Sequence, residues 1–199
     1  MTTVKTIDAL EALYDAAVPA SMTKVVRRIT PHYATWINTA RFCVLATVGP
    51  EGSDASPRGD VGPVVRLVDD TTLHLPDWRG NNRIDSLRNI VRDGRVSLMF
   101  MVPGSSNVIR INGTAVLSVD PDITNSFEQR GKHPKTVIVI TVGEAYFQCA
   151  KAIMRSELWS GEHVADLPTA GQFIKEQQAE FDAQDYDENY AENAQARMW

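Results

Sequence analysis

The sequence predicts a mainly β protein of the α+β class: an antiparallel barrel with helices at both ends of the chain. Six or seven short β-rich runs follow one another at hairpin spacing. Apolar residues at helical spacing mark the first forty residues and the segments after the last strand. A single helix interrupts the strands, so the pattern favours an antiparallel barrel over repeated βαβ units.

Turn-forming residues separate the predicted strands. Turns at 49–52, 69–70 and 103–106 contain glycine, proline, aspartate or serine. Pro57 and Gly59 place the second strand at the edge of the sheet, because proline cannot donate to a strand ladder. The expected strands span 42–48, 55–60, 64–68, 72–75, 96–102, 108–119 and 136–142.

Helical spacing predicts one helix at 82–92, between strands, and another at 150–158, after the last strand. A further helix is expected to begin near Thr169. From Glu176 to Ala196 every charged side chain is acidic, which is typical of a solvated face or a loose tail. The expected organisation is an N-terminal helical extension at 1–40, a barrel domain at 41–160 and a C-terminal helical or acidic tail at 161–199, packed on the barrel or partly loose.

Composition restricts the classes of partner. The 199 residues are 43% apolar and carry a net charge of −5, which disfavours nucleic-acid binding because that needs a basic face. The first residues lack the features of a secretory signal, and no apolar run is long enough for a membrane span. We therefore expect a cytoplasmic protein without membrane or nucleic-acid partners, in which local cations must hold any anionic ligand.

Cysteine and histidine usage points away from disulfide and metal chemistry. Cys43 and Cys149 are isolated and lie among apolar residues, so both are expected to be small, reduced core residues. No two histidines have the spacing of metal ligands, and no metal site is expected.

The stretch from Leu75 to Leu87 contains the first candidate ligand site. A strand ends at a proline, a polar loop follows, and a helix is expected to open at Asn81 or Asn82. Unpaired N–H groups at a helix start favour anions, and Gly80 lets a ligand approach the backbone closely. With Arg79 and Arg83 this forms a plausible phosphate cradle, although a glycine-asparagine helix start is also common without any ligand. Trp78 beside it could cover a ligand or serve packing.

Two further elements carry polar residues inside β-rich runs. Arg58 lies between a proline and a glycine, and it either reaches the surface or points into a pocket, where it could meet Arg83 on one dianion. Arg110 and Asn112 alternate with apolar residues, so they share one face of their strand. That face is either solvent-exposed or a binding groove.

These segments, in this order and spacing, resemble the pyridoxamine 5'-phosphate oxidase-like flavoproteins, the FMN-binding split-barrel group. The resemblance covers about two thirds of the chain and rests on the ordered set, since no single motif is diagnostic. It implies an antiparallel split β-barrel of the FMN-binding type. The matching segments are 55–60, 75–83 with the following helix, 95–113 and, downstream, 146–155.

The resemblance assigns roles residue by residue. It implies that Arg58 and Arg83 hold the phosphate of FMN. Ser56 and Pro57 would then lie along the edge of the flavin.

The same resemblance extends to the helix start and to the downstream segment. It implies that Asn81 and Asn82 lie near the phosphate or the ribityl chain. Lys151 and Arg155 would reach a flavin site from the far side of the barrel, in the partner subunit of a homodimer. Apolar residues of the last strand, Val137 to Ile140, and Trp159 also motivate a homodimer.

One departure from the family pattern concerns the substrate. Pyridoxamine phosphate oxidases carry an arginine-any-histidine motif near the C-terminus, whereas here Arg197 is followed two residues later by Trp199. The expected function is therefore that of an FMN-dependent oxidoreductase that does not oxidise pyridoxamine phosphate. The alternatives are a deazaflavin-dependent reductase of the same fold and a non-catalytic flavin-binding or flavin-sensing protein.

Overall fold

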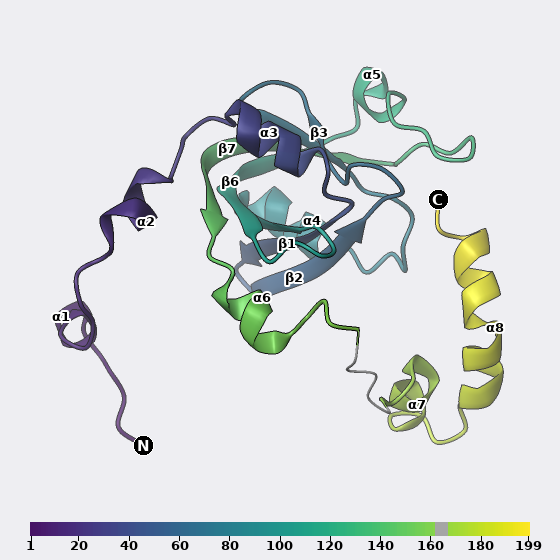
Figure 1. Cartoon of the computed structure of the whole chain (residues 1–199). Helices are drawn as coiled ribbons and strands as arrows, with labels where there is room; N and C mark the ends of the chain where they lie inside the picture. Colours follow the sequence, from purple (N-terminus) through teal and green to yellow (C-terminus); the bar gives the residue numbers. More distant parts are fainter. Residues whose placement is uncertain (162–166) are drawn as a thin grey trace.

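The computed structural model describes residues 1–161 and 167–199. Within them, seven strands form one antiparallel sheet in the order β2-β1-β5-β6-β7-β4-β3, which curls into a barrel (Figure 1). This confirms the predicted split β-barrel with N-terminal and C-terminal helices. The strands are β1 (Phe42–Gly49), β2 (Gly52–Gly59), β3 (Arg66–Leu67), β4 (Thr72–Pro76), β5 (Arg95–Met101), β6 (Val108–Ser118) and β7 (Val137–Gln148).

Helices precede, interrupt and follow the strands. One of them, α4, lies against β1, β2 and β6. None of the helices in the described part of the chain has the length and apolar character needed to cross a membrane. The helices are α1 (Ile7–Glu11), α2 (Pro19–Thr23), α3 (Pro31–Ile37), α4 (Asp85–Arg92), α5 (Pro121–Thr124), α6 (Lys151–Ser156), α7 (Ala170–Lys175) and α8 (Ala183–Ala196).

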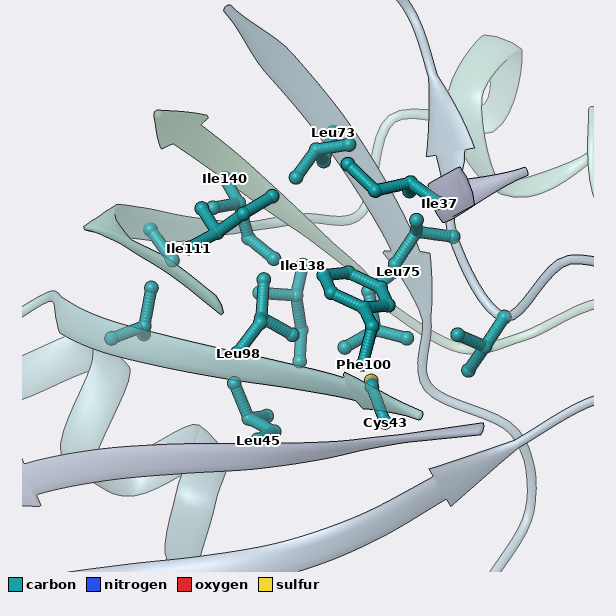
Figure 2. Packing of buried hydrophobic residues seen from close by; sticks show 14 of the residues in the cluster. Ile37, Cys43, Leu45, Leu73, Leu75, Leu98, Phe100, Ile111, Ile138 and Ile140 are labelled. Carbon is teal, nitrogen blue, oxygen red and sulfur yellow. The ribbon is translucent and has the colours of Figure 1, made fainter. Parts of the chain in front are cut away.

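The barrel interior is filled by alternate residues of the central strands (Figure 2). Leu45, Leu98 and Phe100 have no solvent exposure, and each sits on a strand whose intervening residues are more exposed. Ile37 of α3 packs in the same core cluster and is also fully buried. Each such side chain stabilises the fold by about 1.5–3 kcal/mol through burial. The alternation that predicted the strands is thus the alternation that builds the core.

One glycine of the predicted strands is required because the backbones of β6 and β7 approach each other closely. The pairing of β6 with β7 shifts between Asn112 and Gly113, which marks a β-bulge. A Cβ atom at Gly113 would lie 2.0 Å from the carbonyl oxygen of Thr141, so no larger residue fits without moving β7.

Helix α4 is held on the barrel by polar as well as apolar contacts. Leu87 and Ile90 face the core, and Asn89 donates from Nδ2 to the hydroxyl of Thr47 at 3.1 Å inside it. Gly49 allows this approach, because a Cβ there would lie 2.2 Å from Oδ1 of Asn89. These contacts determine where the N-terminus of α4 lies.

Several sequence expectations need correction. The helix expected at 82–92 begins at Asp85, so Asn81 and Asn82 lie in the preceding loop. The strand expected at 64–68 has only two residues, because Val64 and Val65 are buried without pairing as strand residues. In the C-terminal stretch, expected as a helical or acidic tail with a solvated face, α8 spans fourteen residues and buries only Ala183, so no correction is needed there. Residues 162–166, including His163 of the expected tail, lie outside the described residues.

The two cysteines differ from each other. Cys43 is buried as expected, and burial raises the pKa of its thiol to about 12. The expectation for Cys149 was wrong, because its side chain is exposed at the end of β7. A hydrogen bond from the backbone of Lys151 lowers the pKa of the Cys149 thiol. The apolar neighbours in sequence did not predict burial, since the strand ends there.

Candidate functional site

A cavity of about 980 Å³ lies at the edge of the barrel, where β2, the loop after β4 and the start of α4 meet. Residues 132–135, just before β7, also line it, as do Met198 and Trp199 at the end of the chain. Its volume is at the upper end of the range of about 300–1,000 Å³ that is usual for small-molecule sites. Segments far apart in the sequence therefore converge beside one edge strand.

Strand β2 presents a row of polar side chains to this cavity. Asp54, Ser56, Arg58 and Asp60 are half-buried, whereas the residues between them are exposed. Side chains alternate between the faces of a strand, so Asp54, Ser56 and Arg58 lie on one face of β2, and Asp60 directly follows the strand. That face meets α4 and the loop after β4. A strand that packed against the core would carry apolar residues at these positions instead of polar ones.

Arg58 is held at the cavity wall by Asp77, the residue after β4. Nη1 of Arg58 donates to Oδ1 of Asp77 at 2.5 Å, and the two side chains are only 17% and 22% exposed. The backbone N–H of Asp77 donates to the carbonyl oxygen of Thr136 at 3.0 Å, which ties the loop to the start of β7. Nε of Arg58 is buried and has no hydrogen-bond partner among the described residues. A buried donor without a partner costs roughly 1–3 kcal/mol, so this guanidinium has capacity for a further acceptor.

The loop between Trp78 and α4 is shaped by its asparagines. Oδ1 of Asn81 accepts a hydrogen bond from the backbone N–H of Arg83 at 2.9 Å, and Asn82 adopts a left-handed φ of 62°. Arg83 then pairs with Asp85 at 2.5 Å, and this hydrogen bond, with the charge of Asp85, raises the pKa of Arg83. The Arg83 side chain is 80% exposed, so this pair lies at the cavity rim.

The first turn of α4 also faces the cavity. Its N-cap residue, Ile84, supplies no side-chain hydrogen bond to the helix. The hydroxyl of Ser86 donates to Asp54 of β2, which joins the helix start to the polar row. The N-terminal end of α4 adds a partial positive charge on this side of the cavity.

An aromatic pair also lines the cavity. The indole Nε1 of Trp78 donates to Oδ2 of Asp60 at 2.8 Å, and Gln129 donates to the other oxygen of Asp60 at 3.1 Å. Trp199 packs against Trp78 edge-to-face, with ring centroids 5.2 Å apart and planes at 86°. The last residue of the chain therefore belongs to the cavity wall.

Residues 29–149 match the family model of pyridoxamine 5'-phosphate oxidase. This range exceeds half of the chain and includes β1 to β7 and α4. The chain belongs to the pyridoxamine 5'-phosphate oxidase family. It has no match among curated proteins.

Solved structures are similar to this family member at low sequence identity. A variant of HupZ from Group A Streptococcus is 22% identical, with a TM-score of 0.50, and the match covers 60% of this chain and 99% of that one. A protein from Lactobacillus delbrueckii described as a candidate pyridoxamine 5'-phosphate oxidase is 18% identical, with a TM-score of 0.49 and coverages of 61% and 95%. An FMN-binding protein from Syntrophomonas wolfei is 15% identical, with a TM-score of 0.43 and coverages of 56% and 79%.

The cavity brings together most of the site residues that the sequence suggested. Arg58 and Arg83 both line it, one deep in the wall and one at the rim. Lys151 and Arg155 lie exposed on α6 and are not among the lining residues. The predicted residues that line the cavity are Ser56, Pro57, Arg58, Asn81, Asn82 and Arg83.

Sequence reasoning missed the acidic partners of the arginines and the contribution of the chain end. Asp77 and Asp85 are each paired with one of the two arginines, which the sequence alone does not reveal. The polar row of β2 did have a signal, because Asp54, Ser56 and Arg58 recur at every second position. In the described part of the chain, no three histidine, cysteine or acidic side chains are grouped as metal ligands.

The third polar element lies elsewhere. Arg110 and Asn112 occupy the half-buried outer face of β6, opposite the buried Ile109 and Ile111. Asn112 donates to Glu144 at 2.8 Å, and the Arg110 guanidinium lies 5.3 Å from the centre of the Tyr146 ring. A second hollow of about 340 Å³ on this outer face includes Arg110, so this face of the sheet is distinct from the cavity beside β2.

The Arg58–Asp77 pair yields a prediction about stability. Asp77→Ala should lower the free energy of unfolding by about 1–3 kcal/mol, because the half-buried Arg58 would lose its acceptor. Asp85→Ala is the matched control, and it should cost much less because Arg83 stays hydrated at the rim. Urea unfolding of both variants measures the difference, and equal losses would show that Asp77 does not hold Arg58 in solution.

Proposed function

We propose that the cavity binds FMN and that the protein is a flavin-dependent oxidoreductase. The observation that carries this proposal is Arg58, a half-buried cation with an unused buried donor at the wall of a ligand-sized cavity. A phosphate oxygen would satisfy Nε of Arg58 without displacing Asp77, since Asp77 engages only Nη1. Membership of the pyridoxamine 5'-phosphate oxidase family supports the same cofactor.

The surroundings of Arg58 fit a phosphorylated cofactor. The chain as a whole is acidic, so a dianion depends on nearby cations. A Cβ at Gly80 would meet open space, which leaves the loop backbone accessible to a ligand. The lining residues include five cations and four carboxylates, namely Arg58, Arg79, Arg83, Lys132 and Lys135 against Asp54, Asp60, Asp77 and Asp85.

The chain's own residues would bind and orient the cofactor. The isoalloxazine ring of FMN supplies the redox chemistry, which explains why no catalytic triad is needed. Arg58 would hold the phosphate in the wall, with Arg83 at the rim. Asn81 and Asn82 shape the loop that leads to Arg83. Ser56 would lie beside the ligand on the same strand face as Arg58.

The proposal predicts a difference between two flavins. Arg58→Ala should weaken FMN binding about tenfold to a hundredfold, the loss of one charge-assisted hydrogen bond. Riboflavin lacks the phosphate, so its affinity should change little. Arg83→Ala should show the same selectivity with a smaller loss, because Arg83 is exposed and already paired with Asp85. Fluorescence titration measures all four affinities, and equal losses for the two flavins would assign the arginines to shaping the fold.

We also propose that the substrate is not pyridoxamine or pyridoxine phosphate. At the end of the chain, the only basic side chain after Lys175 is Arg197, which caps α8 and is exposed. The surrounding helix is acidic and would repel a second phosphate.

Anaerobic addition of pyridoxine phosphate to the flavin-loaded protein tests this exclusion. The visible flavin absorbance should persist for minutes, because residues 176–199 hold no arginine-any-histidine motif to bind the substrate. Bleaching within seconds would contradict the exclusion, because it would mean that the protein oxidises pyridoxine phosphate. The test needs no knowledge of the electron acceptor.

A homodimer is the proposed assembly. The part of the sequence argument that rested on Val137 to Ile140 was wrong, because Val137, Ile138 and Ile140 are buried in the barrel of their own chain, whereas Trp159 is exposed. Exposed apolar residues elsewhere support pairing instead, since α1 and α2 bury none of their residues and project away from the barrel (Figure 1). In a dimer, Lys151 and Arg155 would approach the site of the partner subunit. The exposed apolar residues of this N-terminal segment are Ile7, Leu10, Leu13, Tyr14, Val18 and Met22.

Light scattering at micromolar concentration tests the assembly. The full chain should have the mass of two copies, with and without flavin, because the apolar N-terminal segment would be covered in both cases. A monomer that still holds flavin would contradict the proposal.

A further inference from the structure

The C-terminal arm, residues 167–199, is built as a unit separate from the barrel. Asp187 of α8 accepts hydrogen bonds from the hydroxyl of Thr169 and, at 2.9 Å, from the backbone N–H of Gly171, so α7 and α8 hold each other. Ala183 is the only residue of α8 that is buried. Figure 1 shows both helices standing apart from the barrel, with the C-terminus turned back toward it.

The arm reaches the barrel through its last residue. Within residues 1–161 and 167–199, no hydrogen bond or ion pair joins the arm to the barrel, whereas Trp199 packs edge-to-face on Trp78. Trp199 is half-buried although the residues before it, from Gln195 to Met198, are exposed. A single aromatic pair favours this position of the arm over a detached one by a factor on the order of 2 to 10. The arm is thus held at the cavity by a contact that a ligand can replace.

The two tryptophans are not equally fixed. Trp78 is anchored to Asp60, which is itself held by Gln129. The indole of Trp199 makes no hydrogen bond within the described part of the chain. Trp78 is therefore anchored by a hydrogen bond, whereas Trp199 is held by its ring contact with Trp78.

The aromatic pair lies in the same cavity as the proposed phosphate anchor, Arg58. Asp60, which accepts the hydrogen bond from Trp78, lies just beyond the end of β2, two residues after Arg58. Trp78 also directly follows Asp77, the partner of Arg58. A molecule with its phosphate at Arg58 can therefore present its other end to Trp78. Both residues line the same cavity, together with Trp199.

We propose that Trp199 contacts the ring of the bound cofactor, and that Trp78 and Trp199 together form the aromatic wall that holds this ring. The inference rests on the proposed function, since it takes the ligand to be a flavin. Trp199 exchanges its edge contact with Trp78 for contact with the ligand ring, so the arm closes more firmly over an occupied cavity. The C-terminal arm is then part of the binding site, and its release accompanies release of the cofactor.

Trp199→Ala in the full chain tests the inference, with Trp199→Phe as the conservative variant. Phe173→Ala is the matched control, because Phe173 is also an exposed aromatic residue of the C-terminal arm but does not line the cavity. FMN and riboflavin are titrated by flavin fluorescence, and their dissociation is followed after dilution. Trp199→Ala should weaken the binding of both flavins by a similar factor of about 2 to 10 and speed their dissociation. It should also restore part of the flavin fluorescence that contact with Trp199 quenches in the wild type. Trp199→Phe should retain most of the affinity, and Phe173→Ala should resemble the wild type.

The outcomes separate this inference from the proposed function. If the wild type binds neither flavin, the proposed function fails. If the wild type binds FMN through Arg58 but Trp199→Ala changes neither affinity, dissociation nor fluorescence, the arm is only packed at the cavity and this inference alone fails. Tighter and faster flavin binding by Trp199→Ala would also overturn it, because Trp199 would then compete with the ligand.

Discussion

Arg58 lies where an edge strand, a loop and the last strand of the barrel meet, and its ion pair with Asp77 joins them. Asp77 follows β4, and its backbone N–H bonds to Thr136, which precedes β7. The pair is only partly desolvated, so a second anion can approach the guanidinium without exposing a bare buried charge. The ligand chemistry of the cavity depends on this arrangement, because the acidic chain offers an anion little attraction elsewhere.

The apolar barrel positions this polar site without contributing to its chemistry. Leu73 and Leu75 of β4 are buried in the core, so the loop that starts with Asp77 leaves the barrel at a fixed point. On the other side, the Asn89–Thr47 hydrogen bond seats α4 on β1, and Ser86 of that helix meets Asp54 of β2. Edge strand β2 is thus bordered by two anchored segments, and its polar row faces the gap between them.

Much of this fold could be predicted because apolar alternation and turn residues act locally. Pro57 and Gly59 correctly placed their strand at the sheet edge, since proline removes a ladder donor. The start of α4 was placed three residues too early, because the Asn81 side chain and the left-handed Asn82 form a turn that competes with the helix. The pairing of Arg58 with Asp77 depends on tertiary contact across nineteen residues, which no local pattern encodes.

The chain end shows the same limit. An acidic, weakly apolar stretch is typical of a solvated tail, and α8 is indeed almost fully exposed. Its contact with the barrel, Trp199 on Trp78, joins residues that only the folded chain brings together. The proposed role of Lys151 and Arg155 depends on a second subunit, because they would act at the flavin site of the partner and not at that of their own chain.

The identity of the natural cofactor tests the central claim most directly. The protein is purified with the cofactor that it carries and is then heated, and the released small molecule is identified by its visible spectrum and its mass. Our account predicts FMN, with the two-band spectrum of an oxidised flavin and one phosphate per molecule, at about one per chain. A deazaflavin, or a flavin without phosphate, would contradict the assignment of Arg58 as the phosphate anchor.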